Sequence, residues 1–117
     1  MINESIIPFT LVDWVNVPST EYPGETGTSW WKTIQYGGLR IRIVEYSADY
    51  LADHWCEKGH LVFCIEGEMT MELSTGDKYH MTKGMSYHVS DNESAHRSYS
   101  KSGVKLWIID GEFLKAK

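Results

Sequence analysis

Residues 53–60 read Asp-His-Trp-Cys-Glu-Lys-Gly-His, a short stretch that holds two histidines and a cysteine. His54 and Cys56 are two apart on a predicted strand, so both side chains point to the same face. His60 follows a glycine-containing turn and is expected to return to that face, and His96 comes after the turn at 90–93. Imidazole and thiolate are ligands preferred by zinc, copper and iron rather than by calcium or magnesium. The stretch therefore predicts a transition-metal site, although a histidine and a free cysteine on one face also suit an ordinary protein core.

Short β-forming runs recur along the chain, separated by turns rich in Gly, Ser, Asp and Asn. No stretch shows a sustained helical period, and many short strands at short spacing indicate a sandwich or a barrel. We expect roughly nine to eleven strands with almost no helix, and a loop at 18–28. The expected strands are Phe9–Val17, Trp30–Tyr36, Leu39–Tyr46, Leu51–Cys56, His60–Glu66, Met69–Leu73, Lys78–Met81, Ser86–Val89, His96–Ser100 and Val104–Asp110.

The spacing of the metal-binding residues resembles the first motif of the cupin superfamily. That motif reads H-x-H, three or four residues, E, six residues, G. Here His54, Cys56, His60 and Gly67 keep the spacing throughout, but Cys56 stands for the second histidine and His60 for the glutamate. Both replacements are still metal-binding side chains, so the resemblance implies that ligation is retained with a softer ligand set.

The second cupin motif is also recognisable. It begins with a glycine, follows a strand through a turn, and ends in the last metal-binding histidine. Gly84, residues 85–89, the turn at 90–93 and His96 fit this pattern, with one residue more than usual and no proline. A register beginning at Gly76 would put Tyr87 at the histidine position. We reject it because the fold needs a hairpin between the motifs, which the turn at 74–77 supplies.

The resemblance implies an all-β fold, the cupin double-stranded β-helix, which is an antiparallel jelly-roll barrel, here with extra N-terminal strands. We expect a single cupin domain over residues 1–117, with its core at about 38–110 and flanking strands within 1–37. The sequence looks closest to small one-domain bacterial cupins marked by an Asp-His-Cys-Trp type run, for which the resemblance implies fold and metal but no activity.

Three histidines and one cysteine, His54, Cys56, His60 and His96, form the predicted ligand set for one divalent metal. Thiolate softness favours zinc, with iron, copper and nickel as alternatives. If all four bind, a tetrahedral zinc has no open position, and the protein is a non-catalytic cupin that binds or senses a metal or small ligand. If one stays off, an open position suits a metalloenzyme acting on a small molecule. We favour the enzyme on fold analogy, and whether the protein is an enzyme at all stays open.

Three further residues are candidates for contacting a small-molecule ligand. Tyr87 and Trp107 are expected either to line the pocket or to pack in the core. Residues 39–45 alternate apolar and polar side chains, which is typical of a half-buried strand. Arg40 and Arg42 on its polar face are expected to face solvent, the alternative being that Arg42 reaches the pocket and holds an anion.

Charge and composition limit the partners. The formal charge of −5 and the pI of about 5.4 make nucleic acid and anionic membranes poor partners. With two cysteines, no disulfide framework is expected, and we predict a cytoplasmic protein. Trp14, Trp30 and Trp31 put more large aromatic surface in the N-terminal flank than one small core needs, which predicts a homodimer using that flank.

Overall fold

The computed structural model describes residues 7–115. Within this range the chain forms nine strands and two short 3-10 helices, which confirms the all-β prediction. None of its helices is long or apolar enough to cross a membrane. The elements are η1 (Trp14–Asn16), β1 (Thr20–Pro23), β2 (Thr28–Tyr36), β3 (Leu39–Tyr46), β4 (Tyr50–Leu51), β5 (His60–Leu73), β6 (Lys78–Thr82), β7 (Ser86–Val89), β8 (His96–Ser100), β9 (Val104–Gly111) and η2 (Glu112–Leu114).

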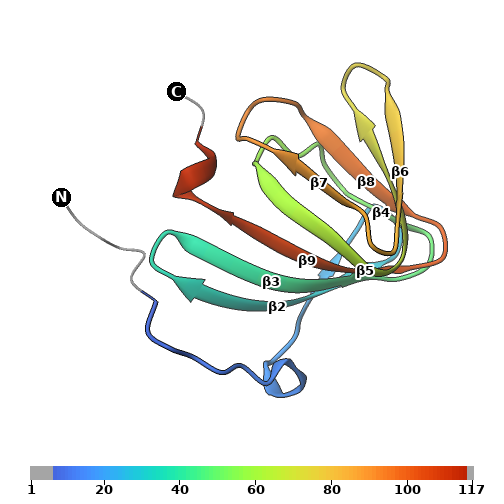
Figure 1. The fold of residues 1–117 in the computed structure, drawn as a ribbon. Helices are drawn as coiled ribbons and strands as arrows, with labels where there is room; N and C mark the ends of the chain where they lie inside the picture. The colour runs from blue at the N-terminus through green and yellow to red at the C-terminus, as the bar shows by residue number, and fades with distance from the viewer. Residues whose placement is uncertain (1–6, 116–117) are drawn as a thin grey trace.

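The antiparallel strands curl into a barrel of two facing sheets, as Figure 1 shows. The order β1-β2-β3-β9-β5 makes one sheet, with β7 also paired to the first half of β5. The second half of β5 pairs with β6 and β8, and β8 pairs with β4. Strand β5 therefore belongs to both sheets and makes the corner between them. The jelly-roll barrel expected from the sequence is the fold observed.

The corner in β5 lies at Gly67, the glycine that ends the first motif. A bulge between Cys64 and Glu66 precedes it. Gly67 has φ of +88°, and a Cβ at this position would collide with the carbonyl oxygen of Gly103. Only glycine fits such a backbone conformation beside a neighbouring strand. The predicted break into two strands at 66–68 is thus wrong, because the chain bends through a bulge rather than a hairpin turn.

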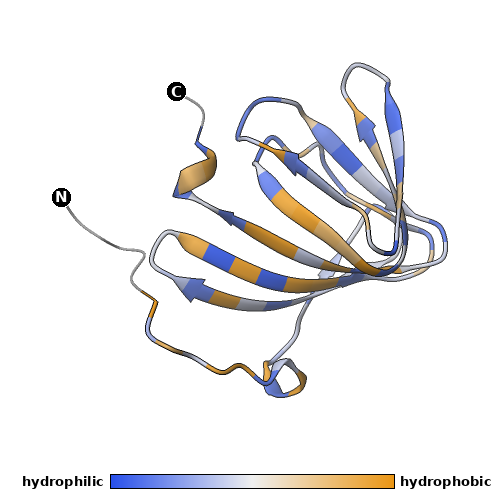
Figure 2. Cartoon of the chain, in the orientation of Figure 1, coloured by the Kyte–Doolittle hydropathy of each residue, from blue (hydrophilic) through white to orange (hydrophobic). Residues whose placement is uncertain are grey.

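The hydrophobic core fills the space between the two sheets. Alternate residues of each strand point inward, and the bulge in β5 changes the inward positions from even-numbered to odd-numbered residues. Figure 2 shows hydrophilic and hydrophobic residues alternating along β3. The buried core residues are Val44, Val62, Cys64, Met69, Met71, Met81, Val104, Leu106 and Ile108. Cys64 is thus a core residue.

The N-terminal flank differs from the predicted pattern. Residues 9–17 form no strand, because the carboxylate of Asp13 accepts a hydrogen bond from the Val15 N–H at 3.2 Å and caps η1 instead. The expected loop at 18–28 contains β1, which pairs antiparallel with β2. The extra N-terminal strands are therefore β1 and β2. Trp14 packs edge-on against Trp107, with ring centroids 5.3 Å apart.

Candidate metal centre

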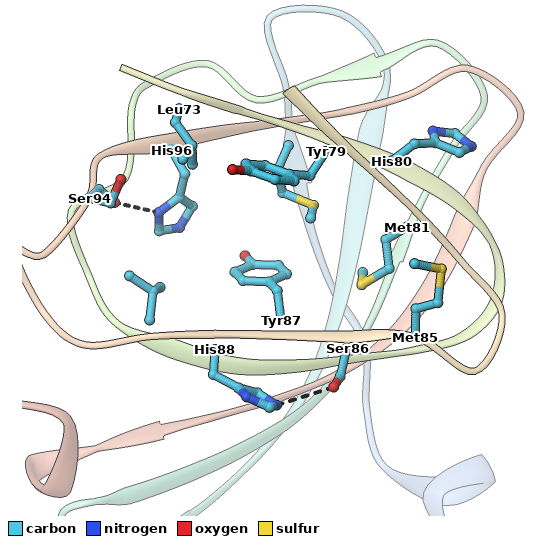
Figure 3. Close-up of a pocket in the computed structure, with 12 residues that line it drawn as sticks. Leu73, Tyr79, His80, Met81, Met85, Ser86, Tyr87, His88, Ser94 and His96 are labelled. Carbon is cyan, nitrogen blue, oxygen red and sulfur yellow. Dashed lines mark hydrogen bonds between the residues drawn. The ribbon is translucent and has the colours of Figure 1, made fainter. Parts of the chain in front are cut away.

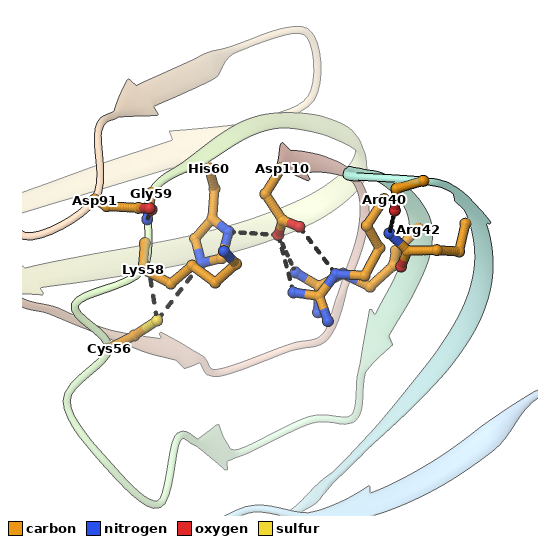
Figure 4. A network of polar contacts seen from close by, with 10 residues as sticks. Arg40, Arg42, Cys56, Lys58, Gly59, His60, Asp91 and Asp110 are labelled. Carbon is orange, nitrogen blue, oxygen red and sulfur yellow. Dashed lines mark hydrogen bonds and ion pairs between the residues drawn. The ribbon is translucent and has the colours of Figure 1, made fainter. Parts of the chain in front are cut away.

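Three of the four predicted ligands, Cys56, His60 and His96, come together at one end of the barrel. Cys56 lies in the loop after β4 and is held beside the start of β8 by two backbone hydrogen bonds with His96, of 2.8 and 3.0 Å. His60 is the first residue of β5. The potential ligand atoms of the three residues all lie within 4.8 Å of one another, and Cys56 Sγ is 3.6 Å from His60 Nε2 (Figure 4).

Both histidines are anchored through Nδ1. His96 Nδ1 is 3.0 Å from the carbonyl oxygen of Ser94, and because a carbonyl only accepts, Nδ1 carries the proton. His60 Nδ1 is 3.0 Å from a carboxylate oxygen of Asp110 and donates to it in the same way. With Nδ1 held in this way, each imidazole keeps its lone pair on Nε2 when the ring is neutral, on the side of the ring away from its anchor. This is the tautomer that binds a metal while the other nitrogen is held by an acceptor.

Asp110 joins the candidate metal centre to two arginines. It lies near the end of β9 with 1% of its surface exposed. Its carboxylate accepts hydrogen bonds from His60 Nδ1, from Arg40 Nε and Nη2, and from Arg42 Nη2, all between 2.9 and 3.0 Å (Figure 4). Burial by itself raises the pKa of this carboxyl, but the hydrogen bonds from His60 and Arg40 and the two guanidinium charges outweigh it. They hold the pKa of Asp110 well below its usual range. The ionised carboxylate fixes the orientation of the His60 ring.

The prediction that Arg40 and Arg42 face solvent is wrong. Arg42 is 3% exposed and points into the barrel beside Val44, whereas Ile41 lies on the outer face. The reason is the register of β3 with β9, which sets Arg40 opposite Asp110 and supplies a buried partner for both guanidinium groups. The alternative considered above, that Arg42 reaches a pocket, describes its position correctly.

The surroundings of the Cys56 thiol lower its pKa. Burial raises its pKa, but the hydrogen bonds with His60, His96 and the Lys58 backbone and the charge of His60 together outweigh burial and lower the pKa to about 5. For His96, burial lowers the pKa, while its contacts with Cys56 and Ser94 raise it above the usual value. The lowered pKa favours the thiolate, which is the form of cysteine that binds metals.

The fourth predicted ligand, His54, does not join the group of three. Its side chain is 72% exposed, and its Nδ1 lies 2.6 Å from a carboxylate oxygen of Asp53. The predicted strand over 51–56 is shorter than expected. β4 ends at Leu51, a bend follows at residues 53–54, and Cys56 forms only an isolated bridge with His96. Without a continuous strand, the two-residue spacing of His54 and Cys56 no longer places both side chains on one face.

Cys56, His60 and His96 line a cavity of about 310 Å³, together with His54, Arg42 and Tyr87 among others. A second cavity, of about 410 Å³, is lined by Met81 and Met85 among others (Figure 3). Tyr87 and His96 line both cavities. Trp107 lines neither of them, since it lies on the outer face of β9 beside Ile41.

Asp110 is the functional residue that sequence reasoning missed. The signal was present, because Val104, Leu106 and Ile108 occupy alternate positions of one strand and Asp110 continues the series. A carboxylate at an inward position of a buried strand needs a hydrogen-bonding partner. His60 can be identified as that partner only when β5 and β9 are known to be neighbours.

Solved structures of other proteins share the fold of this chain. No protein-family model matches the sequence, and no curated protein matches it. The structure of ectoine synthase from P. lautus aligns with a TM-score of 0.72 and 18% identity over 88% of this chain and 78% of that chain. An RmlC-like cupin from Shewanella frigidimarina gives a TM-score of 0.71 and 13% identity over 87% of this chain and 89% of that chain. A sugar phosphate isomerase from a cupin superfamily, from Silicibacter pomeroyi, gives a TM-score of 0.67 and 11% identity over 86% of this chain and 74% of that chain. The chain therefore has the cupin fold.

Proposed function

We propose that this cupin-fold protein is a metalloenzyme that acts on a small molecule beside one divalent transition metal held by Cys56, His60 and His96. The observation that carries the proposal is the anchoring of both imidazoles through Nδ1, which leaves both Nε2 atoms as the ligand atoms beside one thiolate. Carboxylate and carbonyl groups that orient metal-binding histidines are a regular feature of metal sites in proteins.

The spacing of the three side chains suits a tetrahedral metal. With Zn–S of about 2.3 Å and Zn–N of about 2.0–2.1 Å, a sulfur and a nitrogen ligand of one zinc ion lie about 3.6 Å apart. Cys56 Sγ and His60 Nε2 are separated by 3.6 Å. Two nitrogens and one thiolate favour zinc, and iron, copper or nickel are the alternatives.

The proposal of an enzyme rests on the number of ligands. Three protein ligands with an adjacent cavity are typical of catalytic zinc, whereas structural zinc has four. A divalent metal in this position supplies Lewis-acid polarisation of a bound oxygen or activation of a bound water. Burial raises the pKa of Tyr46 and of Tyr87 in the same cavity, so both phenols stay protonated and can donate hydrogen bonds to a ligand.

The alternative function is a closed, non-catalytic metal or ligand site with His54 as the fourth ligand. The observation in its favour is that His54 lines the same cavity as the other three residues. The two functions differ in what His54→Ala does. With three ligands, the variant keeps its metal and its affinity. With four ligands, its affinity falls and the remaining site opens.

Metal analysis tests the proposal directly. Protein purified without chelator is expected to carry close to one transition-metal ion per chain, measured by inductively coupled plasma mass spectrometry. The double variant Cys56→Ser with His96→Ala is expected to carry none. Cys64→Ser, a change at a buried core cysteine outside the group of three, is the matched control and should keep its metal. Full metal content in the double variant would refute the ligand assignment.

A further inference from the structure

A buried hydrogen-bond donor without a partner lies at the wall of the candidate metal centre's cavity. Arg42 lines this cavity and donates from Nη2 to Asp110 at 2.9 Å. Its Nε is fully buried and forms no hydrogen bond with any of the described residues. Buried donors in folded proteins almost always have a partner, and an exception calls for an explanation such as a ligand. Part of the hydrogen-bonding capacity of this guanidinium is therefore available to a bound molecule.

The cavity is positively charged in an acidic protein. Arg40, Arg42 and Lys58 line it, and among the described residues that line it none is a carboxylate. Asp110, behind the arginines, and the ionised Cys56 thiol supply two negative charges against the three positive charges of Arg40, Arg42 and Lys58. The chain as a whole carries a formal charge of −5, so this local excess of positive charge runs against the overall composition. Such a cavity attracts a small anion.

The surroundings of Arg42 select the shape of that anion. The Trp31 ring covers one face of the guanidinium, with its centroid 4.4 Å from the Arg42 Cζ. A ligand that accepts hydrogen bonds from Arg42 approaches in the plane of the guanidinium, because the N–H groups point in that plane. Planar carboxylates match this geometry and accept hydrogen bonds from a guanidinium edge. Tyr46 and Tyr87 supply aromatic surface for a carbon skeleton, and the volume of about 310 Å³ restricts the ligand to a small molecule.

We propose that the ligand of this cavity is a small organic acid whose carboxylate binds the guanidinium of Arg42. The assignment of this acid as a substrate rests on the proposed metalloenzyme function. His60 links the two, because it donates from Nδ1 to the carboxylate that also holds Arg42 and directs Nε2 toward Cys56. The carboxylate is thus bound at one wall of the cavity, and the rest of the molecule faces the side chains that hold the metal. Carboxylate binding by Arg42 itself needs no metal.

Nuclear magnetic resonance of the arginine side chains tests this binding at the atom concerned. Uniformly ¹⁵N-labelled protein, zinc-loaded and chelated in parallel, is titrated with acetate, propionate and pyruvate, and with acetamide as the neutral analogue of acetate. The Arg42 Nε–H resonance is assigned from its loss in Arg42→Lys. The carboxylates are expected to shift this resonance saturably in both metal states, whereas acetamide leaves it unchanged. Inorganic phosphate is the competing anion and is expected to bind more weakly.

Variants separate recognition by Arg42 from general charge. Calorimetric titration of Arg42→Gln should show carboxylate affinity lowered about 10- to 100-fold, as expected for loss of hydrogen bonds to a charged group. Arg42→Lys keeps the charge without the planar fork and should bind more weakly than the wild type. Arg97→Gln is the control, because Arg97 Nε donates to the Ala52 carbonyl and its side chain does not line the cavity. Circular dichroism establishes that each variant is folded.

The outcomes distinguish this inference from the proposed function. Saturable carboxylate binding in protein that binds no metal would overturn the metalloenzyme and keep the anion site. A metal-loaded protein whose Arg42 resonance does not respond to any carboxylate would overturn the anion site and keep the metal centre. Equal affinity for acetamide, a preference for inorganic phosphate, or unchanged binding in folded Arg42→Gln and Arg42→Lys would each refute the assignment.

Discussion

Replacing Asp110 by asparagine is the change that should most clearly separate stability from metal binding in this protein. The wild-type carboxylate accepts four N–H hydrogen bonds, from His60, Arg42 and, twice, Arg40. Asparagine has nearly the same shape but offers one oxygen, and its amide directs two N–H groups toward donors. The variant therefore loses several hydrogen bonds and leaves two guanidinium groups without a compensating charge.

The magnitude follows from burial. Removing one partner from a buried ion pair costs about 3–5 kcal/mol of unfolding free energy. Arg42 and Asp110 are both buried, but the Arg40 side chain is 27% exposed and partly solvated, so we expect about 3 kcal/mol. Because Asp110 also orients His60, zinc affinity should fall about 10- to 100-fold. Glu45→Gln is the control. Glu45 is 54% exposed and pairs with Lys105 at 3.9 Å, so its loss should cost less than about 1 kcal/mol.

The pH dependence gives a second signature of the same group. The folded pKa of Asp110 is held below its unfolded value, so its stabilising contribution is present above the unfolded pKa of about 3.9 and is lost as pH falls from there. The difference between wild type and Asp110→Asn should therefore be constant near neutral pH and shrink in acid.

The assay is urea unfolding of the chelated protein, followed by circular dichroism, with competitive zinc titration of the folded state. Unfolding without metal keeps the stability effect separate from the change in zinc affinity. A loss below about 1 kcal/mol, together with unchanged zinc affinity, would refute the role assigned to Asp110.

Three further predictions concern metal occupancy, the corner of β5 and association. The pKa of His96 is raised and that of Cys56 is about 5, so protons compete with the metal as pH falls from 7 toward 5. Metal occupancy measured by equilibrium dialysis should therefore fall over that range, and unchanged occupancy at pH 5 would contradict the ligand set. Gly67→Ala should lower the melting temperature by more than Gly76→Ala. Both glycines have positive φ, but of the two only Gly67 has a neighbouring backbone atom, the Gly103 carbonyl oxygen, at the place a Cβ would occupy. Equal effects of the two substitutions would contradict this close approach. The predicted homodimer through the flank at residues 1–37 should be seen by light scattering at micromolar concentration, and a mass of 13.4 kDa would count against it.

The sequence by itself determined the fold class and pointed to three residues that lie together in the structure. Turn residues at short intervals and alternating apolar positions allow few arrangements other than a barrel or a sandwich. The spacing from Cys56 to His60 and Gly67 led to a cupin fold, and in the structure Cys56, His60 and His96 meet. These features depend on local geometry and on a fixed count of residues, both of which can be read along one chain. The turns between strands, such as the one at 74–77, likewise depend on the residues within the turn itself.

Only the tertiary structure decided which polar residues face inward. Alternation along residues 39–45 identifies two faces but not which of them is buried, because that depends on the neighbouring strand. Pairing of β3 with β9 joins Arg40 to Asp110, 70 positions away, and makes the arginine face the inner one. His54 shows the converse, since a bend at residues 53–54 removes the strand on which its predicted orientation depended. A charged group can be buried only where another strand supplies its partner, and that partner is fixed by the packing of the whole barrel.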